Sequence, residues 1–414
     1  MEIKALKNQF FHKTKFLVLF VLCGFFVSIF YHFLISTFLG LNFYPFNTFL
    51  FNPVDRFNDF FNIYNATKGL NPYAYDVSVY FPVTFLIMYF FTFLDPFLAI
   101  VLFFIIFVFF FVWYISKNSD LVTALVFLFV SYPVLFLCDR ANVESWLFVF
   151  LGLFIYFYQK KRFFISLIFL SLAISLKLYP IVFIFLFILD RKYLYVLYTF
   201  LVSAFMTVFS ASILKGGIVA SFSGLSHRLS SFDSSYVQSV SHGLQHNSSF
   251  FALFKVCLYG FFGLFKKYFF LHINFDRHEY VFSIAAQNML NIFYRSYFVF
   301  AFLFFCFILF IVWKEKIFWK RMALLVFAMI LLPQISYDYK LIHIFIPMFL
   351  FINFKEKDSK DIVYATLFGL LLIPKDYIIL FQDVSIAVIL NPLIMIIFVF
   401  LIAYNNLVLK KETI

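Results

Sequence analysis

The chain has 414 residues, of which 64% are hydrophobic and 13% are charged, and its mean hydropathy is +0.98. Soluble domains carry about 25% charged residues, so this composition excludes a cytosolic enzyme, a secreted disulfide-linked domain and a coiled coil. The net charge of +12 would suggest nucleic acid in a soluble protein, but here it is typical of cytoplasmic loops that retain Lys and Arg.

The first apolar run covers residues 16–40 and follows a basic N-terminus that carries Lys4, Lys7, Lys13 and Lys15. It is too long for the core of a signal peptide and has no small-residue cleavage site. We therefore expect a retained spanning helix with its basic side in the cytoplasm. The polar residues 41–80 that follow are predicted to form a long first loop outside.

Apolar runs then recur along the chain, separated in several places by short basic segments. The runs are 81–94, 97–115, 121–138, 143–158, 163–176, 178–189, 193–214, 292–313, 321–335, 341–354, 361–374 and 384–408. The basic segments are 160–162, 191–192, 314–321, 355–360 and 410–411. All of them lie inside if 81–94 is a surface or re-entrant helix that ends before Pro96. This path predicts about twelve crossings, with both termini cytoplasmic; if 81–94 crosses fully, the later loops change sides.

On this path the polar residues gather on the outside, so we expect any chemistry there. The sequence holds no Walker loop, no G-x-G-x-x-G, no H-E-x-x-H zinc pair and no G-x-S-x-G elbow. Hydrolytic and NTP-driven functions therefore lose most of their support. The four cysteines show neither metal spacing nor a disulfide pattern.

The first outer loop contains a carboxylate at the start of a short amphipathic pattern. Phe60, Phe61, Ile63 and Tyr64 recur at helical spacing, which predicts a helix at the membrane interface. Asp59 would lie in its first turn, where the helix dipole tolerates a negative charge. Asp59 is then either a capping or first-turn acid, or a general base for a hydroxyl group. The turn Asn71-Pro72-Tyr73 is expected to end the helix.

Two further groups of charges lie at the ends of apolar runs, where charges are costly and usually paired or functional. Asp139, Arg140 and Glu144 form the first group, and Arg140 could simply pair with either acid. Lys177 lies alone between two apolar runs. It is either a side chain that reaches up to the interface or a point charge for a phosphate.

Two later polar segments are less informative. The Ser-rich stretch 215–249 holds His227, His242 and His246, whose spacing fits one helical pair only, so we favour exposed loop histidines over a metal site. The segment 336–340 with His343 fits a turn at the outer rim with an aromatic belt.

The order of these motifs resembles that of the GT-C type polyprenyl-phosphate-dependent glycosyltransferases, specifically glycosyltransferase family 87, the mannosyltransferase-like group. The first-loop pattern D-F-x-x-Y … G-x-x-P-Y … Y-P-P is matched by Asp59-Phe60, Tyr64, Gly69, Asn71-Pro72-Tyr73 and Tyr80-Phe81-Pro82. Its Q-x-N, K-x-x-P, N-Q-S and P-x-S-W-D elements are similar to Asn142, Lys177 to Pro180, Asn247 to Ser249 and Pro333 to Asp338. The chain departs from the family at Val83, at Asp139-Arg140 and at Tyr339-Lys340, which bears on the sugar and acceptor more than on the reaction class.

This resemblance implies an all-α polytopic membrane protein, a GT-C-like bundle of about 12 transmembrane helices with a long first outer loop and a second large outer loop. A single integral membrane domain would cover 1–414. Within it we expect a seven-helix module over 1–214 with outer loop 41–80, an outer loop over 215–291 with an interfacial or re-entrant helix, and variable helices over 292–414.

The resemblance also implies a reaction. The enzyme would move a sugar, a hexose such as mannose or a pentose, with inversion from a polyprenyl-phosphate donor to a glycan or glycolipid acceptor. Asp59 would be the base, and Arg140 and Lys177 would bind the donor phosphate. Contacts to sugar or acceptor would come from Tyr73, Tyr80, Asn142, Asn247 and Asp338.

The expected location is the inner (plasma) membrane of a bacterium, in cell-envelope glycolipid biosynthesis, with the active site facing the periplasm. The expected partners are the donor, the acceptor and the bilayer, and no nucleic acid. No cofactor or metal is expected, although Asp55, Asp139 or Glu144 could hold a divalent ion.

Two other functions stay open. A flippase or transporter of lipid-linked saccharides should show internal repeats and broken helices, and we find no convincing repeat. An O-antigen polymerase or ligase would share the large outer loop but should lack the pattern around Asp59.

Overall fold

The computed structural model describes residues 12–41, 56–75, 79–239, 243–266, 270–274, 279–356, 360–381 and 384–407. Much of the predicted loop 41–80, namely 42–55 and 76–78, lies outside these residues, as do Lys4, Lys7, His242 and the pair 410–411. Helices form nearly all of the described chain, which confirms the predicted all-α class.

The chain folds as two compact units. Unit 1 comprises residues 1–238 and 338–374, and unit 2 comprises 239–337 and 375–414. The predicted division at residues 214 and 291 stays a prediction. Each unit is described by itself.

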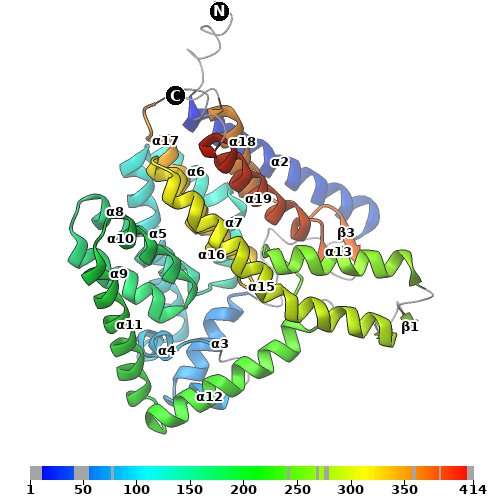
Figure 1. The fold of residues 1–414 in the computed structure, drawn as a ribbon, viewed down its shortest axis with the longest axis horizontal. Coiled ribbons are helices and arrows are strands. Elements are labelled where there is room, and N and C mark those ends of the chain that lie inside the picture. Colours follow the sequence, from blue (N-terminus) through cyan, green and yellow to red (C-terminus); the bar gives the residue numbers. More distant parts are fainter. Residues whose placement is uncertain are drawn as a thin grey trace, which may run out of the picture. The chain divides into compact units, whose positions relative to one another are not determined.

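Unit 1 is a bundle of helices, many of which are joined by short turns (Figure 1). Its elements are α2 (Lys13–Leu39), α3 (Asn58–Thr67), η1 (Pro72–Ala74), α4 (Pro82–Phe91), α5 (Pro96–Asn118), α6 (Leu121–Val130), α7 (Tyr132–Arg140), α8 (Glu144–Gln159), α9 (Phe163–Leu176), η2 (Tyr179–Phe183), α10 (Ile184–Leu189), α11 (Tyr193–Ile213), α12 (Gly217–Phe232), the π-helical turn η3 (Asp233–Val237), η4 (Asp338–Ile344), α17 (Phe345–Ile352) and α18 (Asp361–Leu372).

Unit 2 holds fewer and longer helices, together with two short antiparallel hairpins that the sequence did not predict. Its elements are α13 (Phe250–Leu264), β1 (Phe270–Asn274), β2 (Glu279–Phe282), α15 (Ile284–Lys314), α16 (Phe318–Leu331), β3 (Ile379–Phe381), β4 (Val384–Ser385) and α19 (Ala387–Leu407). α19 packs against α13, α15 and α16. The apolar helix α13 lies within the predicted outer loop 215–291.

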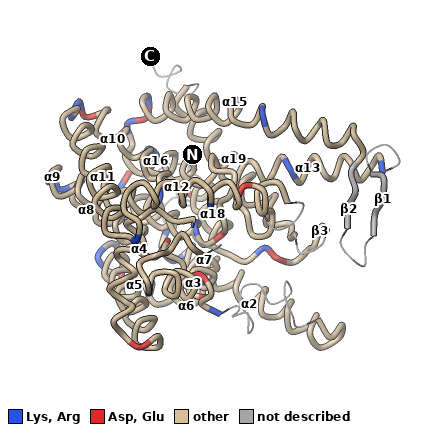
Figure 2. Tube along the Cα trace, turned by 90° about the horizontal axis from the view of Figure 1, so that it is seen from below, with Lys and Arg blue, Asp and Glu red and all other residues tan. Residues whose placement is uncertain are grey.

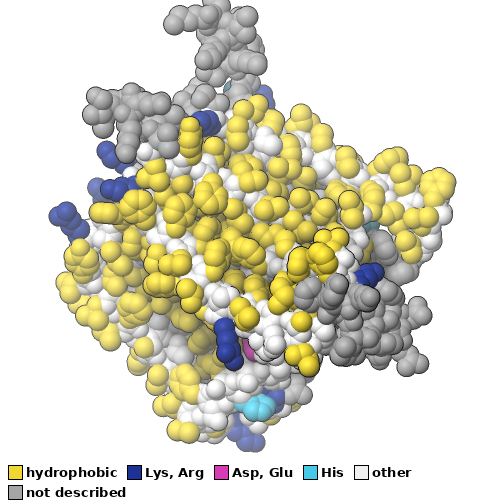
Figure 3. Space-filling model, turned by 45° about the vertical axis from the view of Figure 1, so that its right-hand side comes forward, with side chains coloured by type: hydrophobic (Ala, Val, Ile, Leu, Met, Phe, Trp, Pro, Cys, Tyr) yellow, Lys and Arg dark blue, Asp and Glu magenta, His cyan; other side chains and the backbone are white. Residues whose placement is uncertain are grey.

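Long apolar helices identify the chain as a multi-pass membrane protein. Among the described residues, α2, α5, α11, α15 and α19 are long and apolar enough to cross a membrane, and a sixth span results if α6 and α7 count as one. The other apolar helices have 10–17 residues, fewer than the roughly 20 that a straight span needs. The predicted count of twelve is therefore not confirmed. Hydrophobic side chains cover most of the face seen in Figure 3.

Small residues allow some of these helices to pack closely, as is usual in membranes. α18 lies against α2, and a methyl group added at Gly369 would lie only 2.7 Å from the Phe20 ring. Two of the turns between helices of unit 1 are basic. Figure 2 shows Lys and Arg at the α8–α9 and α10–α11 turns, which hold residues 160–162 and 191–192.

The predicted break before Pro96 is confirmed. α4 has ten residues, about 15 Å of helix, which is half of the roughly 30 Å hydrocarbon core. Asp95 then caps α5, because its side chain accepts the Phe97 N–H at 2.9 Å. α4 by itself is therefore too short to span, as the re-entrant or surface interpretation requires.

The apolar run 121–138 was predicted as one helix, but the structure divides it into α6 and α7 at Ser131, with a bend of 60°. Pro133 has no N–H, so the carbonyl of Phe129 loses its helical partner. At the break itself, the Ser131 hydroxyl donates to the Phe127 carbonyl at 2.5 Å. The bend gives α7 a direction of its own, and α7 ends at Arg140.

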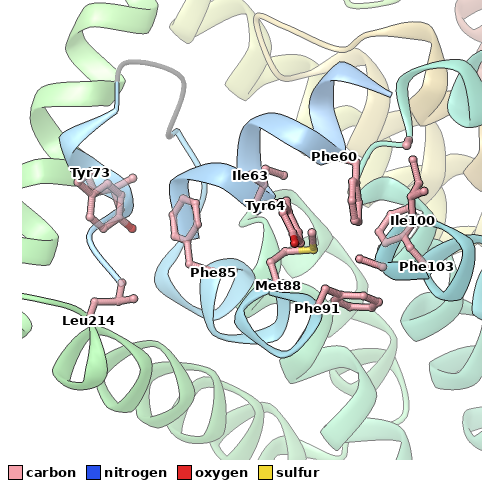
Figure 4. Packing of buried hydrophobic residues seen from close by; sticks show 13 residues of the cluster. Phe60, Ile63, Tyr64, Tyr73, Phe85, Met88, Phe91, Ile100, Phe103 and Leu214 are labelled. Carbon is pink, nitrogen blue, oxygen red and sulfur yellow. The ribbon is translucent and has the colours of Figure 1, made fainter. Parts of the chain in front are cut away.

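The predicted helix after Asp59 is confirmed as α3, but its apolar face is packed against protein. Phe60, Ile63 and Tyr64 are buried and point toward α4 and α5 (Figure 4), where Phe60 meets Phe91 and Phe103 at ring-centroid distances of 6.4 and 5.2 Å. The Tyr64 hydroxyl donates to the Leu94 carbonyl at 2.9 Å. α3 is thus fixed on the bundle of unit 1.

The stretch that begins the predicted loop 215–291 is also helical. α12 packs against α11 and against η1, where Gly224 faces Tyr73 so closely that an added methyl group would lie 2.7 Å from the Tyr73 Cβ. Arg228 Nε donates to the Tyr73 carbonyl at 3.0 Å. These contacts hold Tyr73, a predicted site residue, in place.

Candidate active site

Asp59 lies in the first turn of α3, as the sequence predicted. The start of α3 is tied to the end of α7 by a backbone bond, because the N–H of Phe57 donates to the Asp139 carbonyl at 2.8 Å. Phe57 adopts a left-handed conformation, with φ of 56°, which turns the chain into the helix. The segments that carry Asp59 and Arg140 are therefore joined through their main chains.

Both oxygens of the Asp59 carboxylate are hydrogen-bonded. Arg140 Nη2 donates to Oδ1 at 2.7 Å, and Asn142 Nδ2 donates to Oδ2 at 2.6 Å. A carboxylate has about four acceptor positions, so these bonds leave room for a further donor. The Asp59 side chain is 15% exposed and the Arg140 side chain 23%. The carboxylate is thus held in place and can still be reached.

One residue between Arg140 and Asn142 explains how both reach Asp59. Ala141 ends α7 with φ of 48° and ψ of 45°, a left-handed conformation that non-glycine residues seldom adopt. This left-handed turn joins α7 to α8. The strained backbone therefore lies directly at the site, where such conformations tend to cluster.

Tyr80 adds a hydroxyl to this group. Asn142 Nδ2 also lies 3.3 Å from the Tyr80 hydroxyl, and the Tyr80 carbonyl accepts from the Tyr73 hydroxyl at 2.9 Å. Burial, and then the charge of Asp59, raise the pKa of the Tyr80 phenol well above its usual value. Tyr80 therefore stays a neutral hydroxyl that can donate or accept a hydrogen bond.

A second, deeper group of charges adjoins the first through Asn142. Lys177 Nζ lies 2.6 Å from Glu144 Oε1 and 3.4 Å from Asn142 Oδ1. The Glu144 carboxylate also accepts from the Tyr179 hydroxyl, and His343 Nε2 lies 2.8 Å from its Oε2. Glu144 is fully buried, whereas the Lys177 side chain keeps 15% exposure.

Lys340 brings another amine near this group. Its ammonium lies 4.4 Å from the centroid of the Tyr179 ring. Burial lowers the pKa of Lys340 to about 7, although the nearby Glu144 carboxylate opposes this shift. Its charge therefore changes within the physiological pH range.

The structure brings together five of the predicted residues: Asp59, Tyr80, Arg140, Asn142 and Lys177. Tyr73 reaches the group through Tyr80. The predicted alternatives for Arg140 and Lys177 were a neighbouring acid and the interface. Arg140 instead pairs with Asp59, and Lys177 with Glu144.

Two residues that were predicted to contact the substrate, Asp338 and Asn247, are hydrogen-bonded to groups other than the five residues above. Asp338 is buried in η4 and accepts from the Tyr132 hydroxyl at 2.9 Å. Asn247 belongs to unit 2, where Nδ2 donates to the carbonyls of Gly243 and Gln334 and Oδ1 accepts from the N–H groups of Ser249 and Ser336. The Asn247 amide is thus engaged by backbone groups, and its substrate role stays a prediction.

From the sequence, Glu144 was expected only as a pairing or metal-binding acid, and Tyr179 and His343 had no predicted role in the site. A signal for Tyr179 was present, since it follows Lys177 by two residues. His343 lies 199 residues from Glu144, a separation at which sequence spacing carries no information. Among the described residues, no three His, Cys, Asp or Glu side chains form a group that could hold a metal ion.

The fold and site together define a membrane protein in which several ionisable residues gather around one reachable carboxylate. The chain matches the model of glycosyltransferase family 87 over residues 79–333, more than half of its length, and it belongs to that family. It is therefore a glycosyltransferase. The match includes Tyr80, Arg140, Asn142 and Lys177. No curated protein and no solved structure matches the chain significantly.

Proposed function

We propose that the protein is an inverting glycosyltransferase that uses a polyprenyl-phosphate sugar, with Asp59 as the general base. The observation that carries the proposal is the Asp59 carboxylate, which is partly exposed and held between Arg140 and Asn142. Lys177 is linked to this carboxylate through Asn142, whose Oδ1 lies 3.4 Å from Lys177 Nζ. A fixed base next to two cations suits a reaction that removes a proton and releases a phosphate.

In the proposed reaction, an acceptor hydroxyl attacks the anomeric carbon of the donor from the side opposite the phosphate. The new bond joins the acceptor oxygen to that carbon while the bond from carbon to the phosphate oxygen breaks. Asp59 takes the hydroxyl proton, and the polyprenyl phosphate leaves with the bonding electrons. Arg140 and Lys177 stabilise its growing charge, so the step requires no metal ion.

The contacts in the structure support the roles of the other predicted residues to different degrees. Tyr80 and Asn142 touch the Asp59 group and are placed to contact the sugar or acceptor. Tyr73 supports Tyr80 through its hydroxyl. Asp338 and Asn247 stay proposals from the resemblance alone.

The proposed setting is the outer leaflet of a bacterial inner membrane, where the acceptor would be a glycan or glycolipid of the cell envelope. The distribution of Lys and Arg supports this orientation, because the turns at 160–162 and 191–192 are basic and such turns stay in the cytoplasm. A hexose such as mannose is the first sugar to test.

The test is the Asp59→Asn variant in membranes supplied with polyprenyl-phosphate mannose and a glycolipid extract. Asparagine keeps the shape but cannot accept a proton, so transfer is expected to fall about 10²- to 10⁴-fold while the protein still accumulates in the membrane. Wild-type turnover in that variant would remove Asp59 from the mechanism.

A second measurement separates the proposed transferase from a flippase. Mass spectrometry of lipid-linked glycans from a deletion strain, compared with its parent, is expected to show glycans that lack one sugar. Accumulation of a complete glycan that is not exported would favour the flippase instead.

A further inference from the structure

The deeper group of charges is organised around one carboxylate. Glu144 is fully buried, and its two oxygens accept from three side chains: Lys177, Tyr179 and His343. A buried charge with this many donors is stable only as a complete network. No step of the proposed reaction uses Glu144 directly, so its presence next to the site needs another explanation.

The Asn142 amide supplies the connection. Its oxygen accepts from the Glu144 backbone N–H at 3.0 Å and from Lys177 Nζ at 3.4 Å. Both partners are donors only, so the oxygen must face them and the NH₂ group must face the other way. That direction is toward Asp59 Oδ2, at 2.6 Å, and the Tyr80 hydroxyl, at 3.3 Å. A reversed amide would place an oxygen against the Asp59 carboxylate.

We propose that Glu144 is a positioning residue. Its carboxylate holds Lys177, and Lys177 in turn orients the Asn142 amide and keeps its own positive charge near Asp59. The chain of contacts runs from the Glu144 carboxylate to Lys177, then to Asn142, and ends at Asp59. The inference rests on the proposed function, since Asp59 must be the base for this arrangement to affect catalysis. Glu144 itself touches no substrate.

The packing around Lys177 agrees with this role. Its ammonium lies 5.4 Å from the centroid of the Tyr80 ring and 5.8 Å from that of Tyr339. These rings bound the ammonium, while Glu144 holds it at 2.6 Å. Stability alone would not require this charge, because a buried ion pair can often be replaced by apolar residues without loss.

The kinetic test is a double-mutant cycle of Glu144→Gln and Lys177→Met. Gln keeps the shape and the backbone N–H of residue 144 but removes the charge, and kcat is expected to fall about tenfold, as for coupled neighbours. If Glu144 acts through Lys177, the double variant is no slower than Lys177→Met alone. Effects that multiply in the double variant would overturn the proposal.

The conservative variant Glu144→Asp separates the positioning role from a merely structural one. Glu144→Asp keeps the charge and is expected to recover part of kcat, with the acceptor KM unchanged. Asp361→Asn is the matched control, because it removes a carboxylate from the Lys13–Asp361 pair of 3.1 Å, also in unit 1. Its kcat is expected to equal that of wild type.

A chemical readout keeps this inference separate from the proposed function. Acetylation of lysines in intact membranes, measured by peptide mass spectrometry, needs no sugar substrate. Lys177 is expected to react several-fold faster in Glu144→Gln, and Lys13 faster in Asp361→Asn. Unchanged labelling of Lys177 would show that Glu144 does not hold it. A wild-type enzyme that transfers no sugar would instead refute the proposed function, while the labelling still decides whether Glu144 holds Lys177.

Discussion

The backbone N–H of Phe57 donates to the carbonyl of Asp139 across 2.8 Å. This bond joins the start of α3 to the end of α7 without using any side chain of the site. Substitutions at Asp59, Arg140 and Asn142 should therefore change the chemistry while the scaffold persists. Variants at these positions are informative for that reason.

Arg140→Met tests the cation that faces the base. We expect a fall of about 10²-fold in kcat/KM, since the variant loses a charge-assisted bond of 2.7 Å to Asp59 and a charge that stabilises the leaving phosphate. Arg140→Lys should recover only part of the activity, because Lys cannot reproduce the planar guanidinium. Donor titrations in the transfer assay measure both. Equal activity of the Met variant and wild type would contradict the phosphate role.

Asn142→Asp and Asn142→Ala form a matched pair. Aspartate would place a second carboxylate where Nδ2 now lies 2.6 Å from Asp59 Oδ2, so repulsion should displace the base. Alanine only deletes the bond. We expect Asp to lower kcat more than Ala does, with membrane levels measured by immunoblot as the control. The reverse order would argue against the amide orientation described above.

Lys340→Met tests the cost of a buried charge. The folded-state pKa of about 7 lies below the ordinary value of 10.5, so the unfolded chain binds more protons between these pH values and native stability rises with pH there. Removing the amine should therefore raise the melting temperature most at pH 7 and below. The gain should shrink as the pH approaches 10. Melting in detergent at pH 6, 8 and 9.5 measures it, and a gain that grows with pH would reverse the sign.

Gly224→Val tests the contact between α12 and the Tyr73 turn. A Cβ at this position would lie 2.7 Å from the Tyr73 Cβ, and neither backbone can yield easily. Overpacking of this kind costs about 1–3 kcal/mol, so a lower melting temperature is expected. Gly260→Val is the control, because nothing lies within 4 Å of a Cβ there. Equal melting of the two variants would show that α12 is not held as described.

Metal removal tests the proposed role of the two cations. Transfer in washed membranes is expected to survive excess EDTA, because Arg140 and Lys177 supply the positive charge that the departing phosphate needs. The assay is the same mannose transfer with and without chelator. Activity that disappears with EDTA and returns with Mg²⁺ or Mn²⁺ would overturn the metal-free mechanism.

Local sequence signals predicted much of the fold around the site. The spacing of Phe60, Ile63 and Tyr64 predicted α3, and Pro96 marked the start of α5, because periodicity and proline act within a few residues. The break at Ser131 was missed although Pro133 was visible in the sequence. The run 121–138 indicated one continuous helix, because a long hydrophobic stretch favours an unbroken span.

The members of the site were easier to predict than their partners. Arg140 and Lys177 stood out as charges at the ends of apolar runs, and Asp59 as a carboxylate at the start of an amphipathic pattern. Both are local signals. Arg140, however, pairs with a residue 81 positions away, and the sequence suggested only its neighbours. Such a pair depends on how α3 packs against α7, and a single sequence contains no record of that packing.

Phe60 follows Asp59 directly and is sealed inside the bundle. The packing of Phe60 therefore fixes the backbone that carries the carboxylate, and Arg140 and Asn142 hold its two oxygens. In the proposed reaction every incoming glycan must deliver its own hydroxyl to that fixed point. The length and stiffness of the acceptor would then decide which sugar unit is extended, so that regioselectivity would come from reach rather than from a mobile catalytic arm.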